Sequence, residues 1–259
     1  MQWHREDTEA ALCCVCGSAG KHLYDVAPFG VVRCERCELV FVSPRLRTDI
    51  LADLYSDPRY HCDIYDRSPA MLLQRIWTDA RLKIAVREFA RPPACGRLLE
   101  IGSGRGVFLD AARGAGFEVT GVELSADAAA RARATYGLTV HSVDVAHAPL
   151  DGSFDVVCAW DTVEHMPDPV DFWRLVAKLL APDGVVLFST PYITSWPSRL
   201  FRRRWWTLKP AEHLWHFTPR THHAVAAAAG LRITGIHTNP LRRANFARLD
   251  SLIGTARAA

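Results

Sequence analysis

The sequence lacks any long apolar run, although 49% of its 259 residues are hydrophobic. A membrane-spanning helix needs roughly 18 or more consecutive apolar residues, so no such helix is expected. The first ten residues, MQWHREDTEA, are polar and charged and contain none of the apolar segment that a secretory signal requires. We therefore predict a cytoplasmic protein without a membrane partner.

A strong charge of either sign is also missing. The formal net charge is +3 and the isoelectric point lies near 8.5. This mild balance argues against a dedicated nucleic-acid-binding protein. The length and the 23% of charged residues fit a globular protein, so we expect one main domain with a small appendage.

Cysteine, in contrast, is well represented, with eight residues. Four of them form two close pairs with the spacing C-x2-C-x17-C-x2-C, namely Cys13, Cys16, Cys34 and Cys37. Without an export signal this spacing favours a zinc site over disulfides, and four thiolates leave no position for water, so the metal would be structural. Short apolar runs at 22–26 and 30–34 predict the strands of a zinc ribbon over residues 1–45.

Residues 46–96 are interpreted as a linker and a helical lid. A polar, tyrosine-rich stretch precedes apolar residues at helical spacing over 70–90, and the prolines of RPPACG end that helix. Tyr55, Tyr60 and Tyr65 either close over a ligand or pack the linker.

From residue 97 onward, apolar strands alternate with amphipathic helices, which is typical of a parallel sheet covered on both faces. Ser125 and Asp168 are placed as helix N-caps. We predict a doubly wound α/β domain over 97–259, with a substrate insertion at about 191–220. The expected strands are 97–101, 118–123, 138–143, 154–160 and 184–190, and the expected helices are 106–114, 126–135 and 169–180.

A glycine turn follows the first of these strands, in LLEIGSGRG. Val107 stands where a phosphate-binding loop needs Lys, and Gly106 follows Gly104 too closely for a dinucleotide fingerprint. Glu100 ends the strand, and its carboxylate would repel a pyrophosphate but attract an ammonium or a sulfonium group. The turn therefore favours a cationic nucleoside without phosphate.

Two further carboxylates fit such a ligand. Glu123 ends the second strand, where an acid binds ribose hydroxyls, and Asp144 follows the third strand, where it is placed for the adenine amine. In order, EIGSGRG, GVELS, SVDVA and FDVVCAWDTVEHMPDP resemble the motifs of class I S-adenosylmethionine-dependent methyltransferases over about residues 97–192.

This resemblance implies a Rossmann-like, mostly parallel sheet and S-adenosylmethionine as the cofactor. The methionine part would lie at the glycine turn, and Trp160 with Asp161 would line the methyl side. The implied cofactor residues are Glu100, Gly102, Ser103, Gly104, Gly106, Glu123, Leu124, Asp144, Val145, Trp160 and Asp161. Many bacterial relatives resembling this chain carry the zinc ribbon with Gly where this sequence has Glu38, a departure that weakens the second cysteine knuckle.

Two segments offer groups for catalysis. Asp161-x-x-Glu164-His165 resembles the arrangement that binds a divalent ion in some quinone and small-RNA O-methyltransferases, which implies magnesium or manganese. The alternative is that the acid and His165 only cap helices. Glu212-His213 resembles the Glu-His pair of zinc-carrying sugar C-methyltransferases, in which the His is the proposed base.

In this interpretation Glu212 raises the pKa of His213, and the catalytic candidates are His213, Glu212 and His165. Those sugar enzymes carry a Tyr where this chain has Pro210, and they have a long C-terminal domain that this sequence lacks. The alternative to this catalytic role is that His213 is only a histidine in a surface loop. The preceding SRLFRRRWWTLKP binds a phosphate and a base, or forms an amphipathic lid.

The end of the sequence departs from the family pattern. A sixth strand is expected at 231–238, but residues 241–259 have the pattern of a helix where the family has a last antiparallel strand. An unpaired sheet edge would favour a homo-oligomer.

We expect methyl transfer to carbon or oxygen of a small-molecule acceptor such as a natural product, a sugar or a quinone. The alternatives are an RNA or protein methyltransferase that docks through the ribbon and the Arg/Trp segment, and a non-catalytic binding protein that keeps the cofactor fold.

Overall fold

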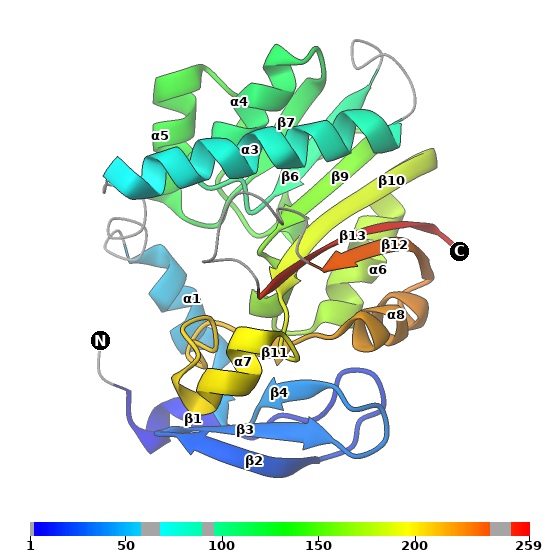
Figure 1. The fold of residues 1–259 in the computed structure, drawn as a ribbon. Helices are drawn as coiled ribbons and strands as arrows, with labels where there is room; N and C mark the ends of the chain where they lie inside the picture. The colour runs from blue at the N-terminus through cyan, green and yellow to red at the C-terminus, as the bar shows by residue number, and fades with distance from the viewer. Residues whose placement is uncertain (1–2, 58–67, 90–95, 239–249) are drawn as a thin grey trace.

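The computed structural model describes residues 3–57, 68–89, 96–238 and 250–259 (Figure 1). Tyr60 and Tyr65 lie outside these ranges. Within them, no helix combines the length and the apolar composition that crossing a membrane requires.

A seven-stranded sheet with the order β12-β13-β10-β9-β6-β7-β8 forms the centre of the molecule. Strands β6 to β10 are parallel to one another, and the order reverses between β6 and β9. In such sheets ligands bind outside the carboxyl ends of the strands at this point. The parallel strands are β6 (Arg97–Ile101), β7 (Glu118–Val122), β8 (Val140–His141), β9 (Phe154–Trp160) and β10 (Leu180–Pro191).

Helices cover both faces of this sheet, and alternate strand residues pack against each layer. Leu98 and Val156 belong to the buried cluster that includes residues of α3, α4 and α5, whereas Leu99 and Val157 belong to the cluster of α6 and α8. The expected class I methyltransferase fold is thereby confirmed. The helices are α3 (Ser68–Phe89), α4 (Val107–Gly114), α5 (Ala126–Tyr136), α6 (Pro169–Leu179) and α8 (Pro219–Ala228).

The C-terminal end of the chain corrects one prediction. Residues 251–258 do not form a helix but β13 (Ser251–Ala258), which inserts antiparallel between β10 and β12 (Leu231–Thr238). The strand is buried on both faces, so its sequence shows no alternation, and Gly254 lets the backbone pass against the ring of Phe188. The missing strand was the reason to expect association through a free edge, and that reason no longer holds.

The N-terminal segment forms a small antiparallel ribbon whose sheet has the order β11-β4-β3-β2. The two predicted strands are confirmed, and the fourth strand comes from the distant segment β11. A second short pair, β1 (Thr8–Glu9) with β5 (Arg45–Leu46), closes the ribbon, and α1 (Thr48–Ser56) leads away from it. The ribbon strands are β2 (Gly20–Val26), β3 (Phe29–Cys34), β4 (Val40–Val42) and β11 (Trp215–His216).

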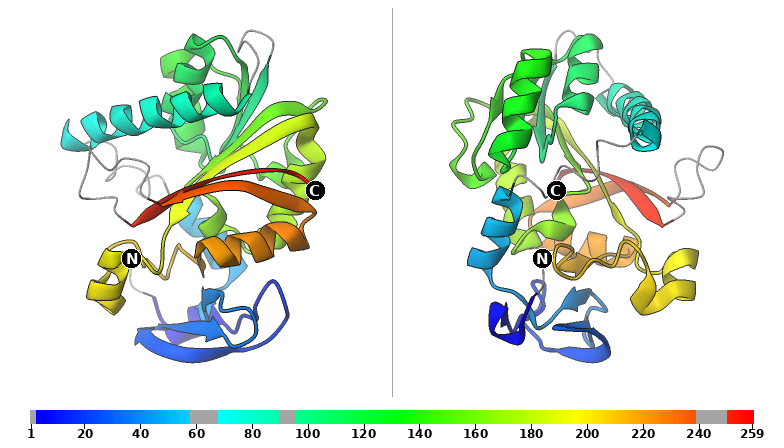
Figure 2. Two further views of the ribbon diagram at one scale, coloured as in Figure 1. Left: turned by 45° about the vertical axis from the view of Figure 1, so that its right-hand side comes forward. Right: turned by 90° about the vertical axis from the view of Figure 1, so that its left-hand side faces the viewer.

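Figure 2 shows the ribbon at the end of the molecule opposite α4 and α5. Between β10 and α8, the chain makes an excursion toward this ribbon through α7 (Trp196–Phe201) and the 3-10 turn Arg202–Arg204. A bridge between Tyr192 and Phe217 closes the excursion at its base.

Candidate active site

The glycine turn lies at the carboxyl end of β6, at the point where the strand order reverses. Gly102, Gly104 and Gly106 have φ of +74°, +53° and +78°, a region that favours glycine. A Cβ at Gly102 would lie 2.7 Å from Thr162 Oγ1, so the turn also packs closely on the loop after β9. The backbone of the turn thus requires glycine independently of any ligand.

Two buried side chains of this turn carry polar atoms that have no hydrogen-bond partner among the described residues. They are Oε2 of Glu100 and Oγ of Ser103. Burial raises the pKa of Glu100 well above its usual range, while the positive charge of Arg81 acts in the opposite direction. A buried carboxyl group with one unpartnered oxygen, below a glycine turn, is suited to a cationic or hydrogen-bond-donating ligand.

Glu123 is buried where β7 ends and holds the glycine turn in place. Its carboxylate accepts hydrogen bonds from the Gly104 amide at 2.7 Å and the Ser125 amide at 2.8 Å. Each oxygen keeps a further lone pair for a ligand. Leu124 beside it is 41% exposed, and Asp144 is exposed and caps the short turn Val145–His147 through the Ala146 amide.

Asp161 follows β9 in a left-handed conformation with a φ of +49°. Its carboxylate accepts hydrogen bonds from Ser189 Oγ at 2.9 Å and from Arg81 at 2.6 Å. The Arg81 guanidinium also stacks over the buried Trp160 ring, 5.0 Å from its centre. Sequence analysis did not identify Arg81, because nothing in the pattern of α3 distinguishes it from the other arginines of that helix.

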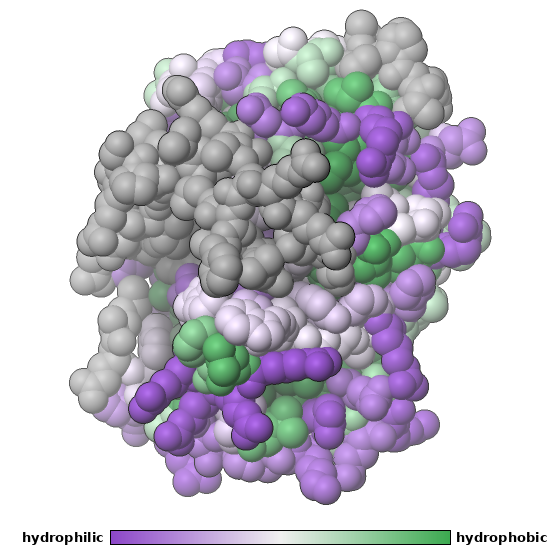
Figure 3. Space-filling view, in the orientation of Figure 1, coloured by the Kyte–Doolittle hydropathy of each residue, from purple (hydrophilic) through white to green (hydrophobic). Residues whose placement is uncertain are grey.

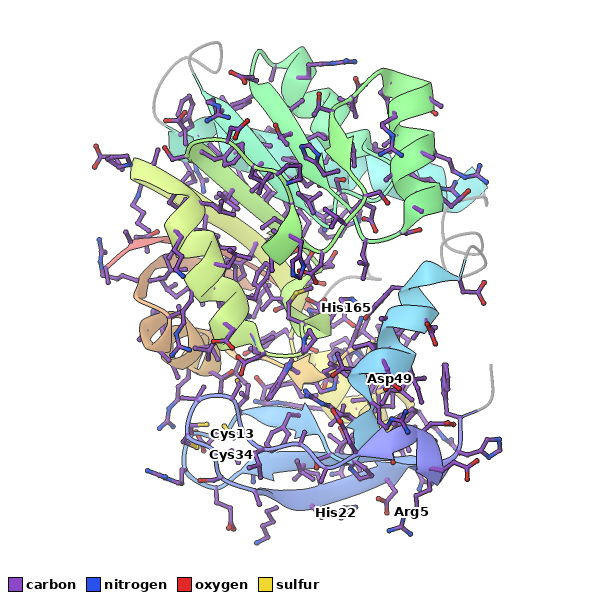
Figure 4. All side chains as sticks on the ribbon, turned by 180° about the vertical axis from the view of Figure 1, so that it is seen from behind. Arg5, Cys13, His22, Cys34, Asp49 and His165 are labelled. Atoms are coloured by element: carbon purple, nitrogen blue, oxygen red, sulfur yellow. The ribbon has the colours of Figure 1, made fainter. Side chains whose placement is uncertain are left out.

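On the side of the turn nearer the ribbon, two histidines lie edge to face, with ring centres of His165 and His213 4.7 Å apart. His165 Nδ1 is 2.8 Å from the Tyr55 hydroxyl, and His213 Nδ1 is 2.6 Å from the Thr207 carbonyl. Figure 4 shows His165 between the central sheet and the ribbon. The structure therefore brings together two catalytic candidates that are 48 positions apart in the sequence.

The predicted role of Glu212 is wrong in one respect. Burial, together with the neighbouring His165, lowers the pKa of His213 to about 3, and these effects outweigh the charge of Glu212, which acts to raise it. The Glu212 carboxylate lies 3.4 Å from the Lys209 ammonium. His213 is buried and neutral at ordinary pH, and it is not a surface loop histidine.

The predicted divalent-ion set is also rearranged. Glu164 and His165 lie together, but their partner is His213, and one ligand atom from each of these residues lies within 4.8 Å of the others. Asp161 is instead bonded to Ser189 and Arg81, as described above. The amide of Leu214 donates to the Glu164 carbonyl at 2.8 Å and joins the two segments.

The four predicted cysteines of the ribbon converge. Their sulfur atoms all lie within 4.8 Å of one another, with Cys13 and Cys37 at 3.3 Å and Cys16 and Cys34 at 3.3 Å. Figure 4 shows Cys13 and Cys34 side by side at one end of the ribbon. Four thiolates around a tetrahedral zinc with bonds of about 2.3 Å are separated by roughly 4 Å, so this donor set fits the metal.

The Arg/Trp segment divides between the interior and the surface. Trp205 is buried and donates to Asp250 at 2.7 Å, whereas Trp206 is 47% exposed. Exposed apolar side chains of α7 lie beside exposed arginines, and Figure 3 shows them as a green patch bordered by purple. Only part of this segment therefore has the character of the predicted lid.

Comparison with known proteins identifies the family of this chain. The sequence profile of a methyltransferase domain matches residues 51–235. The chain belongs to this methyltransferase family. Ubiquinone biosynthesis O-methyltransferases are among its similar relatives, with 33% identity over 134 residues for Aromatoleum aromaticum, covering 49% of this chain and 55% of the relative. For Neisseria meningitidis the identity is 35% over 141 residues, covering 50% and 56%. The methyltransferase thus spans about half the length of the curated relatives it matches.

Solved structures support the fold. Magnesium protoporphyrin IX methyltransferase from Synechocystis PCC 6803, with bound S-adenosylhomocysteine, superposes with a TM-score of 0.63 at 16% identity, covering 82% of this chain and all of that one. A Burkholderia thailandensis 1,6-didemethyltoxoflavin-N1-methyltransferase gives 0.61 at 20% identity, covering 92% and 99%. At these identities the agreement establishes the architecture of the methyltransferase and leaves its acceptor open.

Proposed function

We propose that this methyltransferase transfers a methyl group from S-adenosylmethionine to an oxygen atom of a small-molecule acceptor. The observation that carries the proposal is the pair of buried, unpartnered atoms at the glycine turn, Glu100 Oε2 and Ser103 Oγ. They fit the ammonium end of the cofactor, and the family of the chain supports the same ligand.

The remaining cofactor contacts follow from the same turn. The glycines and Ser103 would surround the methionine part, and the free lone pairs of Glu123 would accept the ribose hydroxyls. Leu124 and Val145 would contact the adenine, and Asp144 would accept its amine. The positive charge of Arg81 acts on Glu100, and its guanidinium donates to Asp161, so it would counter the negative charge of the bound amino acid.

The histidine pair supports transfer to a hydroxyl group. His165 lies in the short turn that follows Asp161 and contacts His213, and a neutral imidazole offers a lone pair that is able to accept a proton. In the step that we propose, the acceptor hydroxyl passes its proton to the histidine pair, and its oxygen attacks the methyl carbon in line with the breaking carbon–sulfur bond. The products are a methyl ether and S-adenosylhomocysteine. Curated relatives that are named O-methyltransferases favour oxygen over carbon.

We also propose that Cys13, Cys16, Cys34 and Cys37 bind one structural zinc ion. Their mutual distances support the site, and Cys14, between the first two, is outside the cluster. The alternative of a non-catalytic binding protein loses its main support, because the last antiparallel strand is present as β13. The RNA or protein alternative rests on the exposed apolar and arginine side chains of α7.

Calorimetric titration of the zinc-loaded protein with S-adenosylhomocysteine and with NAD tests the cofactor. We expect binding of the first ligand only, and a loss of roughly 10- to 100-fold in affinity for Glu100→Gln and for Glu123→Gln, as each removes a charged partner. Glu118→Gln is the matched control, because Glu118 is an exposed residue at the start of β7, the strand that ends just before Glu123. Affinity should rise with pH, since the ammonium group requires the ionised form of Glu100, whose pKa is raised in the free protein.

Binding of NAD, or no binding of S-adenosylhomocysteine to a folded protein, would overturn the proposal. If the cofactor binds but the acceptor screen yields no methylated small molecule while RNA is methylated, the docking alternative applies.

A further inference from the structure

Exposed apolar side chains gather on α7 and on the turn that follows it. Of the eight large apolar side chains that are exposed among the described residues, four lie within residues 196–206. Trp196 and Leu200 are 60% and 58% exposed, and Phe201 and Trp206 complete the group. Single exposed apolar residues are common on protein surfaces, but a contiguous group of this kind marks a contact site.

The same segment carries positive charge that no described residue neutralises. Exposed arginines elsewhere, such as Arg131 and Arg174, form ion pairs with an aspartate. The sequence has no acidic residue between Asp183 and Glu212. Four arginines of the segment are exposed and their side chains form no ion pair with a described residue, namely Arg199, Arg202, Arg203 and Arg204. Together with the four apolar side chains they form one surface, the α7 surface (Figure 3).

The buried side of the segment fixes the α7 surface to the body of the molecule. Trp205 is buried and donates from its indole N–H to Asp250 at 2.7 Å, and it packs against residues of the ribbon. Its neighbour Trp206 lies on the outside, with its ring centre 5.5 Å from that of Phe201. Figure 2 shows α7 at the outer margin of the molecule. The exposed rings and guanidinium groups are therefore presented on a supported, projecting surface.

This combination of side chains favours an anionic lipid surface as the partner. Trp, Phe and Leu are the side chains that enter the interface of a bilayer, where Trp is particularly favoured. The guanidinium groups would meet the headgroup phosphates, and their alkyl stems would lie along the acyl boundary. RNA would use the aromatic rings and the arginines, but it offers no apolar environment to Leu200, which has no ring to stack on a base.

We propose that residues 196–206 dock the protein on the surface of a membrane that is rich in anionic lipid. The four apolar side chains enter the interface, and the four arginines bind headgroup phosphates. Such a surface contact differs from a membrane-spanning segment, on whose absence from the sequence the prediction of no membrane partner rested. The docking surface does not depend on the proposed function.

Flotation of the zinc-loaded, full-length protein with lipid vesicles tests the surface. We expect binding to phosphatidylcholine vesicles that contain about a third phosphatidylglycerol, and none to phosphatidylcholine alone. Arg203→Gln should lower the affinity about fivefold and Leu200→Ser roughly tenfold, because one removes a charge and the other a buried apolar group. The matched controls Arg232→Gln and Leu23→Ser change exposed residues outside the α7 surface and should bind as the wild type does. Circular dichroism verifies that each variant is folded.

Quenching of tryptophan fluorescence by lipids that are brominated on the acyl chains tests whether the surface enters the bilayer. Among the described tryptophans only Trp196 and Trp206 are exposed, so quenching reports on these two rings. The double variant Trp196→Phe/Trp206→Phe should still bind the vesicles, since Phe keeps an apolar aromatic ring, but it should lose most of the quenching.

Three results would overturn the docking surface. They are no flotation of the folded wild type with anionic vesicles, equal binding by Leu200→Ser and the wild type, and binding without quenching. Binding of RNA by a protein that ignores the vesicles would assign the segment to the RNA alternative instead. Failure of S-adenosylhomocysteine to bind a protein that floats with the vesicles would overturn only the proposed function, so the two failures are distinguishable.

Discussion

Glu38 and Gly17 occupy the same place in the two cysteine knuckles. In each knuckle this residue donates its amide to the carbonyl of the first cysteine, at 2.8 Å for Gly17 to Cys13 and 3.0 Å for Glu38 to Cys34. Their φ angles are +65° and +66°. The second knuckle therefore forms as the first one does, but with a side chain in a conformation that glycine adopts at lower cost.

Replacing Glu38 by Gly should stabilise the protein. A left-handed non-glycine residue costs about 1–2 kcal/mol, part of which is offset by the larger entropy that glycine has in the unfolded chain. The variant also loses the ion pair with Arg220, whose side chains are 53% and 75% exposed and which contributes at most about 1 kcal/mol. We expect a net gain of roughly 0.5–1 kcal/mol in the free energy of unfolding, measured with urea on the zinc-loaded protein.

Two variants complete this comparison. Arg220→Ala isolates the ion pair, and Gly17→Ala should destabilise the first knuckle by about 1 kcal/mol or more, since the positive φ is then imposed on a side chain. A Glu38→Gly protein that is less stable than Arg220→Ala would show that backbone strain does not matter at this position.

At the level of elements, the ribbon and the histidine site are one continuous structure. Strand β4 pairs with β11, so that Phe41 lies opposite Trp215 and the Val42 amide donates to the Leu214 carbonyl at 2.9 Å. The Leu214 amide in turn donates to Glu164. The loop that carries His213 is therefore held between the ribbon and the turn after β9, whereas the contacts that hold the glycine turn come from the end of β7 and from Thr162.

Removal of zinc should consequently affect the acceptor side more than the cofactor side. After chelation, we expect hydrogen exchange to accelerate at residues 205–217 and methyl transfer to fall by about tenfold or more, while the affinity for S-adenosylhomocysteine changes less than about threefold. Zinc added back should restore both. Equal loss of cofactor binding, or unchanged exchange at 205–217, would contradict this division.

The elements that could be predicted from the sequence are those whose residues carry a local signal. The strands over 97–101 and 154–160 are continuous apolar runs, and Ser125 and Asp168 cap α5 and α6 as expected. Strand β13 was missed because it is buried on both faces and therefore shows no alternation, and its small and charged residues also suit a helix. Expected strand 138–143 shrinks to Val140–His141 at the sheet edge.

The candidate site shows the same limit. The glycine turn and the cysteine pairs are contiguous motifs, so their residues were identified directly. Arg81, Tyr55 and Thr207 reach the site from three separate segments through hydrogen bonds to Asp161, His165 and His213. Such contacts depend on how the segments pack and leave no spacing pattern in the sequence.

At the scale of the whole molecule, ribbon and sheet share one buried core. A single apolar cluster extends from Cys13 and Phe41 in the ribbon to Phe188 and Ala256 in the central sheet. Loss of packing at one end is therefore transmitted to the other, and the described part of the protein should unfold as one cooperative unit.

Two histidines inside this unit make its stability sensitive to acid. As for His213, burial lowers the pKa of His216 and of His222 to about 3, from an ordinary value of 6.5. Below pH 6.5 these histidines therefore become protonated in the unfolded chain, whereas in the folded protein they stay neutral down to about pH 3. Stability is lost as the pH falls through this window, by about 1.4 kcal/mol per pH unit for each histidine. Glu100 acts in the opposite direction, because its pKa is raised in the folded protein. At pH values above its ordinary pKa of 4.5 the folded protein binds one proton there that the unfolded chain does not, and this offsets part of the loss of stability.

His216→Leu separates the histidine contribution from that of Glu100. Both ring nitrogens of His216 are buried and have no hydrogen-bond partner in the described ranges, so leucine should already stabilise the protein by roughly 1 kcal/mol at pH 7. Between pH 6.5 and 4 this advantage should grow by about 1.4 kcal/mol per pH unit, because the variant lacks one of the protons that drive unfolding. Urea unfolding across this range measures the difference. Parallel curves for the wild type and the variant would mean that His216 is protonated in the folded protein, and that its surroundings accept the charge.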